Sequence, residues 1–245
     1  MKKFILFIFI FLFSIPAFAM DVNTIIAKTD ALMRGKTSYG EFLITTKTPK
    51  WERTLKLESW SEGTTKSFIR INYPLKDKGT TFLKIKNDFW QYIPKIERTI
   101  KFPPSMMLQS WMGTDFTNDD LVKESSIVED YTHKLLEETQ TTYIIESNAK
   151  PNAPVVWGKL IQQIDKIYFY PIKIDYYDED NQLVRTLIYS EVKKFTDRLI
   201  PSVWTMIPKT EDKAGNTTIV KIDSMEFNQD IPNLFTLQAL KNMAR

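Results

Sequence analysis

The chain has 245 residues, with 33 basic and 30 acidic side chains and no cysteine. This balance of charge gives no indication of a nucleic-acid partner, because proteins that bind phosphate backbones usually carry a basic excess. The absence of cysteine excludes disulfides, cysteine-ligated metals and a cysteine nucleophile, so the fold depends on a hydrophobic core.

The N-terminus has the pattern of a secretory signal peptide. Lys2 and Lys3 precede an apolar run over residues 4–15, and Ala17 and Ala19 form a small-x-small cleavage site. The run is short for a membrane span, which needs about 20 apolar residues. We therefore expect residues 1–19 to be removed, and residues 20–245 to be a soluble protein of the periplasm.

A single amphipathic helix is predicted at the start of the mature chain, from Asp21 to Arg34. Apolar residues such as Ile25, Ile26 and Met33 recur at helical spacing. Asp21 suits the N-terminal cap, and Gly35 stands where a helix often ends. The apolar face of this helix is expected to pack on the rest of the fold.

From Ser38 onward, the sequence has short runs of β-forming residues separated by turn signals. Many consecutive strands after one helix favour a large antiparallel sheet that is strongly curved or closed, because a flat sheet would expose an apolar face and long edges. Its large aromatic residues line either a packed core or a cavity. The expected strands are 39–47, 53–61, 64–73, 80–86, 89–93, 97–102, 129–138, 141–147, 159–166, 167–177, 182–195, 200–207 and 217–228. The aromatic residues are Phe42, Trp60, Phe82, Trp90, Tyr92, Trp157 and Trp204.

The segment 103–122 interrupts these strands with an apolar, methionine-rich sequence. In a helix, Leu108, Trp111 and Met112 would share one face, and Gly113 would end the helix after about two turns. A second short helix is expected to begin at Thr117 or Asn118. The segment is then either a core helix that plugs the sheet or a movable lid over an apolar cavity, for which adaptable methionines are suited.

Catalytic and metal-binding patterns are missing from the sequence. His133 is the only histidine, and no Gly-x-Ser-x-Gly motif accompanies it. Residues 175–180 lack the glycine and glutamate spacing of a calcium-binding loop. Helix capping accounts for Asp115, Asp119 and Asp120 more simply than a catalytic carboxylate pair does. We therefore expect no enzyme activity, no metal and no cofactor.

Four sequence stretches together resemble a known family. They are Ser105–Leu121 (SMMLQSWMGTDFTNDDL), Gly79–Ile85 (GTTFLKI), Trp90–Ile100 (WQYIPKIERTI) and Ile231–Thr236 (IPNLFT). With the exported N-terminus, the first helix and the many strands, they resemble the outer-membrane lipoprotein-sorting proteins, relatives of the periplasmic lipoprotein carrier LolA. The resemblance covers essentially all of the mature chain.

The resemblance implies a mainly β fold with helices, in which about eleven antiparallel strands form a half-open barrel. It also implies that residues 20–245 form one domain, with 103–122 as a helical lid over an apolar cavity. The implied function is to carry the acyl chains of lipoproteins or lipids from the inner toward the outer membrane, with only transient membrane contact. Two alternatives stay open: a lipid-sensing adaptor of an envelope-stress regulator, and a partner of an inner-membrane lipid exporter.

The resemblance also implies which residues contact the acyl chains. They are the apolar residues of the lid and, where strand alternation turns them inward, three aromatic residues. In the carrier, an arginine before a proline at the end of an early strand bonds the lid. Here Tyr73–Pro74 stands at that place, so Arg70, three residues earlier, is the predicted latch. The predicted contact residues are Met106, Met107, Leu108, Trp111, Met112, Phe116, Phe82, Trp90 and Tyr92.

Overall fold

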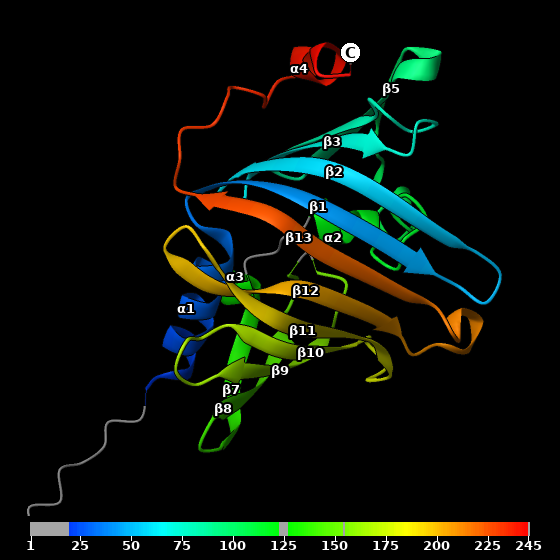
Figure 1. Cartoon of the computed structure of the whole chain (residues 1–245). Coiled ribbons are helices and arrows are strands. Elements are labelled where there is room, and N and C mark those ends of the chain that lie inside the picture. Colours follow the sequence, from blue (N-terminus) through cyan, green and yellow to red (C-terminus); the bar gives the residue numbers. More distant parts are fainter. Residues whose placement is uncertain (1–19, 123–126, 154, 245) are drawn as a thin grey trace, which may run out of the picture.

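The computed structural model describes residues 20–122, 127–153 and 155–244, which form one highly curved antiparallel sheet and a few helices (Figure 1). The predicted signal peptide lies outside the described residues. The helices are α1 (Val22–Arg34), η1 (Pro94–Ile96), η2 (Pro104–Met106), α2 (Asn118–Val122), α3 (Ile127–Asp130), η3 (Glu211–Lys213) and α4 (Leu237–Asn242). The first strands are β1 (Thr37–Lys47), β2 (Glu52–Glu62), β3 (Lys66–Tyr73), β4 (Thr81–Ile85), β5 (Asp88–Ile93) and β6 (Arg98–Lys101). The others are β7 (Tyr131–Glu138), β8 (Thr142–Ala149), β9 (Lys159–Asp165), β10 (Pro171–Tyr177), β11 (Leu183–Phe195), β12 (Arg198–Pro208) and β13 (Thr217–Phe227).

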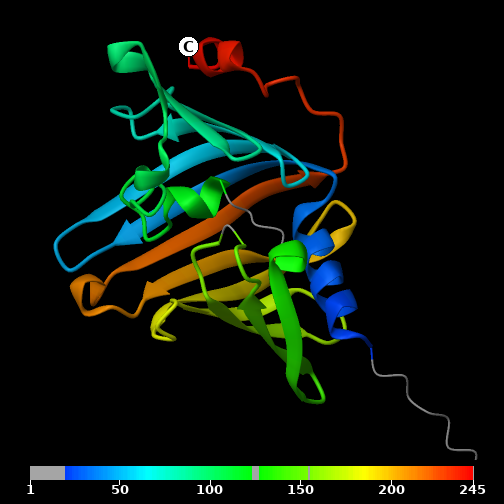
Figure 2. The same cartoon turned by 180° about the vertical axis from the view of Figure 1, so that it is seen from behind.

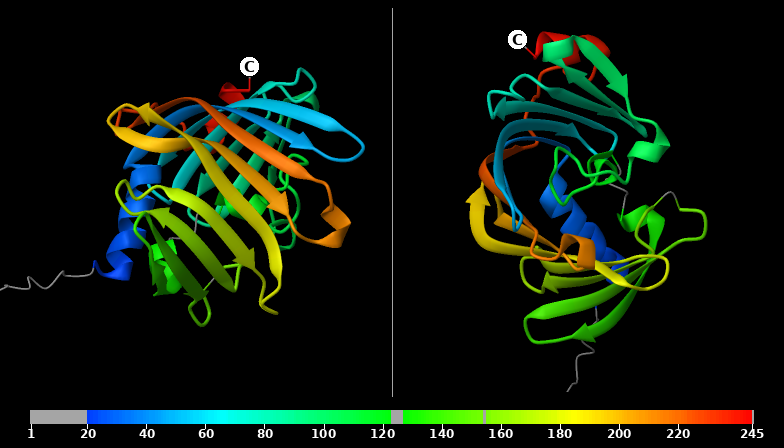
Figure 3. Two further views of the ribbon diagram at one scale, coloured as in Figure 1. Left: turned by 60° about the horizontal axis from the view of Figure 1, so that its bottom comes forward. Right: turned by 90° about the vertical axis from the view of Figure 1, so that its right-hand side faces the viewer.

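The sheet is open, and consecutive strands mostly lie side by side. Its order is β6-β5-β4-β3-β2-β1-β13-β12-β11-β10-β9-β8-β7, so β6 and β7 are its two edges. Figure 3 shows that the sheet curls around the first helix without closing. The prediction of a mainly β, half-open architecture is confirmed in this coarser form. The implied number of about eleven strands is wrong: thirteen strands form within the described residues, because short exposed pairings such as β5–β6 extend the sheet at its edges.

The helix α1 lies across the concave face of the sheet (Figure 2). Ile25 and Ile26 are fully buried in a cluster with residues of β8 and β9, and the helix end carries Met33 to β12 and β13. The Asp21 carboxylate accepts a hydrogen bond from the Thr24 backbone N–H at 3.2 Å, which confirms the predicted cap. At the other end, Arg198 of β12 donates to the backbone oxygens of the last turn, where a cation is favourable.

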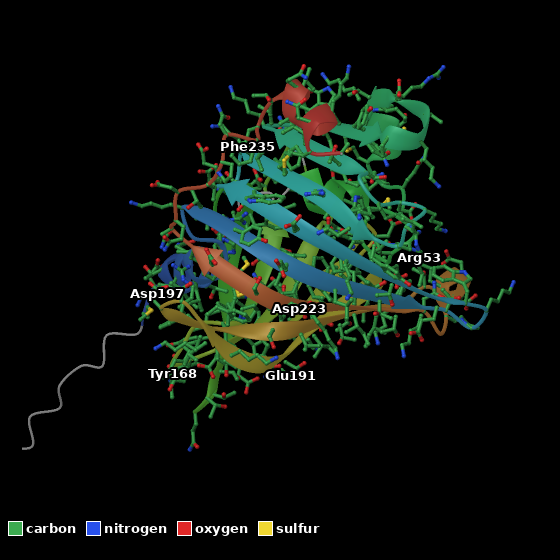
Figure 4. All side chains as sticks on the ribbon, turned by 45° about the horizontal axis from the view of Figure 1, so that its top comes forward. Arg53, Tyr168, Glu191, Asp197, Asp223 and Phe235 are labelled. Atoms are coloured by element: carbon green, nitrogen blue, oxygen red, sulfur yellow. The ribbon has the colours of Figure 1, made fainter. Side chains whose placement is uncertain are left out.

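The two faces of strands β2 to β5 carry different parts of the chain. On the concave face, Leu57, Ile69 and Phe82 pack under the segment that follows β6. Their neighbours Phe68 and Leu83 point to the convex face, since consecutive strand residues alternate. The C-terminal segment covers that face with Leu234 and α4, and Figure 4 shows Phe235 on it.

Within the described residues, the chain passes once from one edge of the sheet to the other. β6 and β7 are consecutive in sequence but lie at opposite edges, and the chain between them, of which residues 102–122 and 127–130 are described, packs on the concave side. In the described part of the chain, no helix combines the length and the apolar character that crossing a bilayer requires.

Candidate functional site

The crossing segment, whose described residues are 102–122 and 127–130, is largely irregular and is held by specific hydrogen bonds. Its helical turn η2 ends at Met106, and Met112 and Gly113 both have a positive φ, at 51° and 77°. The Trp111 backbone N–H donates to the Phe116 oxygen at 2.8 Å, which closes a tight loop. The helix of about two turns expected before Gly113 is therefore wrong, because these backbone groups pair across a loop instead of along a helix.

The second predicted helix of the segment is confirmed. It is α2, which begins at Asn118 directly after Thr117. The Asp120 carboxylate accepts from the Thr117 backbone N–H at 2.7 Å, and the Thr117 hydroxyl accepts from the Asp120 N–H at 3.2 Å. This reciprocal pairing is a capping box, which fixes the direction in which α2 leaves the loop.

Side chains from three strands hold the crossing segment to the sheet. From β2, Arg53 donates to the Met112 backbone oxygen at 2.7 Å (Figure 4 labels Arg53). From β13, the Thr218 hydroxyl donates to the Asp115 carboxylate at 2.8 Å. From β11, Arg185 donates to both oxygens of Asp120, at 2.6 and 2.7 Å. Because the three contacts come from separate strands, they set the distance between segment and sheet.

Arg185 and Asp120 form a buried ion pair next to aromatic rings. The guanidinium carbon lies 4.2 Å from the Trp157 ring centroid and 4.4 Å from that of Tyr176. Burial alone would raise the pKa of the Asp120 carboxyl, but the Arg185 charge and the hydrogen bonds from Arg185 and Thr117 bring it below its usual value. Burial, with a further contribution from Asp120, raises the pKa of Tyr176 to about 12. The tyrosine therefore stays neutral and the ion pair stays charged near neutral pH.

Two adjoining cavities lie between the sheet, α1 and the crossing segment. The larger has a volume of 340 Å³ and is lined mainly from α1, β9, β10 and β11, and the smaller has 200 Å³ and is lined mainly from β1, β2, β3 and β13. The larger volume falls in the usual range of ligand pockets, about 300–1,000 Å³. The residues that line both cavities are Met33, Arg34, Phe116, Asp120, Leu121 and Trp204. The crossing segment and the end of α1 therefore separate two halves of one largely apolar space.

The model of a protein family described as uncharacterized, DUF1329, matches residues 63–242, well over half of the chain. The chain belongs to the DUF1329 family. Comparison with curated proteins gives no match. A solved DUF1329 structure, from Desulfovibrio piger, has a TM-score of 0.81 at 20% identity, covering 89% of this chain and 97% of its own.

Two further solved structures place this DUF1329 protein in a known fold. A LolA superfamily protein from Nitrosomonas europaea has a TM-score of 0.75 at 20% identity, covering 90% of this chain and 99% of its own. An outer membrane lipoprotein-sorting protein domain from Vibrio parahaemolyticus has a TM-score of 0.74 at 20% identity, covering 88% and 97%. At this identity the likeness shows a shared fold, which confirms the predicted resemblance.

Within this DUF1329 fold, two of the predicted contact residues line a cavity. Trp111 lines the smaller cavity and Phe116 lines both. The ring centroids of Phe82 and Trp111 lie 5.5 Å apart, with the rings tilted by 58°, in the core beneath the segment, where Met106, Met107 and Met112 also pack. Leu108 is 62% exposed. Trp90 and Tyr92 pack under the C-terminal segment on the convex face, away from the linings of these two cavities.

The arginines that hold the crossing segment are Arg53 and Arg185, and neither was predicted. Arg70, the predicted latch, forms an ion pair with Glu58 of β2 at 3.8 Å. Sequence reasoning also missed Leu121 and Met33, which line both cavities. Leu121 could have been found, because it lies one helical turn from Thr117 on the apolar side of a predicted helix.

The described residues contain no group of three histidine, aspartate or glutamate side chains placed to hold a metal ion. His133 lies on the edge strand β7, where its Nδ1 is 2.8 Å from the Ser147 hydroxyl. Burial lowers the pKa of His133, so the imidazole is neutral near pH 7.

Proposed function

We propose that this protein is a periplasmic carrier that binds the acyl chains of lipoproteins or lipids on the concave face of its sheet and moves them from the inner toward the outer membrane. The observation that carries the proposal is the pair of adjoining cavities beneath the crossing segment. Their walls are mainly apolar and aromatic, with Phe116, Leu121 and Trp204 shared between them. The fold shared with LolA superfamily and lipoprotein-sorting structures supports it.

The energetics suit a carrier. Burying one methylene contributes about 0.8 kcal/mol, so about ten buried methylenes contribute about 8 kcal/mol. This free energy corresponds to a dissociation constant near micromolar. A carrier needs such intermediate affinity, because it must hold an acyl chain in water and still release it to a better acceptor.

The open sheet offers a route for loading. The edges β6 and β7 are not paired with each other, so no strand pairing has to break between them, and among the described residues the concave side is covered by α1 and the crossing segment. Segment and sheet are joined mainly by side-chain contacts such as those of Arg53 and Thr218. The hydrogen bonds of Arg53 and Thr218 can exchange for water at low net cost, since a typical hydrogen bond contributes only about 1 kcal/mol. We therefore expect an acyl chain to enter without unfolding the sheet.

The test is native mass spectrometry of the protein purified from the periplasmic fraction of an expressing bacterium, followed by solvent extraction. We expect a protein mass that matches residues 20–245 and a released acyl lipid or acylated peptide. A protein that is recovered empty, and that also fails to take up added lipoprotein or fluorescent lipid, would contradict the proposal.

A further inference from the structure

Two buried N–H donors of cavity-lining residues have no hydrogen-bond partner in the described part of the chain. They are Nε of Arg185, which lines the larger cavity, and Nε1 of Trp111, which lines the smaller. The two residues are 5% and 2% exposed. Leaving a buried donor unpaired costs about 1–3 kcal/mol, so a folded protein normally satisfies it. The position of one such donor in each cavity points to a ligand that supplies acceptors.

The Arg185 side chain is fixed, so its free donor has a defined position. Its Nη1 and Nη2 atoms both donate to Asp120, and its flat face lies against Trp157 and Tyr176. Rotation to find another partner would break the two hydrogen bonds and both ring contacts. Nε, itself buried, is therefore held in a defined position, and an acceptor that reaches it meets a preorganised donor, which lowers the cost of binding.

The charges around the larger cavity select a neutral acceptor. Two arginines, Arg34 and Arg185, face three aspartates, Asp30, Asp119 and Asp120. Arg34 is paired with Asp30 at 2.8 Å, and Arg185 is paired with Asp120. With both arginines already paired, an anionic carboxylate or phosphate would lose its water without meeting an uncompensated cation among the described residues that line this cavity, which is costly. The indole of Trp111 is also an uncharged donor.

We propose that Arg185 Nε–H and Trp111 Nε1–H bind the carbonyl oxygens of ester- or amide-linked acyl chains, with one chain in each cavity. This inference rests on the proposed carrier function and names its ligand class: molecules in which two acyl chains are joined through carbonyl groups. Because Phe116 and Leu121 line both cavities, a molecule with two chains can straddle them. An alkyl chain without a carbonyl leaves both donors unpaired.

The test is a competition between an ester lipid and an ether lipid of the same length and headgroup. The full mature chain is incubated with equal amounts of dipalmitoyl phosphatidylcholine and its dihexadecyl ether analogue in detergent, and native mass spectrometry gives the ratio of the two complexes. The ether analogue lacks the carbonyl oxygens but keeps the chains. For each donor, we expect the ester lipid to be preferred by about three- to tenfold. This ratio corresponds to the net free-energy contribution of one hydrogen bond.

Two conservative variants assign this preference to the donors. Arg185→Lys keeps a cation beside Asp120 but has no Nε–H, and Trp111→Phe keeps a ring without the indole N–H. Each is expected to lower the ester preference by about three- to tenfold. The matched controls Arg98→Lys, on the exposed edge strand β6, and Trp51→Phe, in the exposed β1–β2 turn, should leave it unchanged.

The outcomes separate the inference from the proposed function. Equal loading of ester and ether lipids by the unaltered protein would overturn the carbonyl inference and leave the carrier function standing. Loading of neither lipid, together with a failure to take up added lipoprotein, would overturn both. An unchanged ester preference in the two variants, with circular dichroism confirming their fold, would also overturn the assignment to Arg185 and Trp111.

Discussion

At the scale of single residues, the ion pair of Asp120 and Arg185 predicts a pH-dependent stability. The pKa of Asp120 is lower in the folded protein than the ordinary value of about 3.9. The stabilisation is therefore complete above about pH 5 and is lost as the pH falls through 3.9 toward the lower folded pKa. Asp120→Asn should lower the free energy of unfolding at pH 7 by about 3–5 kcal/mol, because it leaves Arg185 buried without a counterion.

Chemical denaturation in steps from pH 7 to pH 3 measures this effect. Below pH 5, the free energy of unfolding of Asp120→Asn should fall less steeply with decreasing pH than that of the unaltered protein. Asp197→Asn is the matched control, since the Asp197 side chain is 68% exposed and its ion pair contributes little. Equal stability of Asp120→Asn and the unaltered protein at pH 7 would show that the pair does not hold the crossing segment.

At the scale of elements, Gly113 lets the crossing segment turn back on itself. Its φ of +77° is strained for any residue with a Cβ, so Gly113→Ala should lower stability by roughly 1 kcal/mol and loosen the loop that Arg53 holds at Met112. Gly63→Ala is a matched control, because Gly63 also has a positive φ, +55°, and lies in the β2–β3 turn with open space around it. Both variants should lose similar stability by thermal denaturation, but only Gly113→Ala should alter lipid uptake. Equal uptake by the two would show that the loop geometry is not needed for binding.

The same loop shows where prediction of elements from the sequence fails. The spacing of Leu108, Trp111 and Met112 fits a helix. A loop forms instead, because the Trp111 backbone N–H donates to the Phe116 oxygen. The side-chain amide of Asn118 donates to the Met106 oxygen at 2.9 Å and stabilises the same loop. The helix α1 and the strand runs were predicted well, because apolar residues recur regularly along each element and clear turn signals stand at its ends. Local periodicity carries no information about a loop held by tertiary contacts.

The candidate site was predicted only in part for a similar reason. Trp111 and Phe116 were found because the apolar segment is visible in the sequence. Arg185 was missed because it lies 65 residues from Asp120, and nothing in its own strand indicates a buried charge. Trp90 and Tyr92 were placed among the candidates because strand alternation defines two faces without saying which one is concave.

At the scale of the whole molecule, the order of strands makes residues 102–130 the only described connection across the concave side. A curved sheet with its two edges joined by one crossing segment has a face that can open while the strands stay paired. The sequence predicts this curvature only through the number of strands, because an open sheet of thirteen strands cannot remain flat without exposing an apolar face. The position of the crossing segment over that face, by contrast, is set by three contacts distant in sequence.

The last prediction tests whether the concave face is where ligand binds. Leu121 lines both cavities, so Leu121→Glu places a carboxylate between them that must stay hydrated or be buried at high cost. Uptake of a fluorescent lipid should fall by about tenfold or more, which corresponds to at least about 1.4 kcal/mol of binding free energy. Leu121→Ala only enlarges the cavities and should retain uptake, and Leu136→Glu, at a 46% exposed position on β7, should have no effect. If Leu121→Glu is folded by circular dichroism and takes up lipid as well as Leu136→Glu does, the acyl chains bind elsewhere on the molecule.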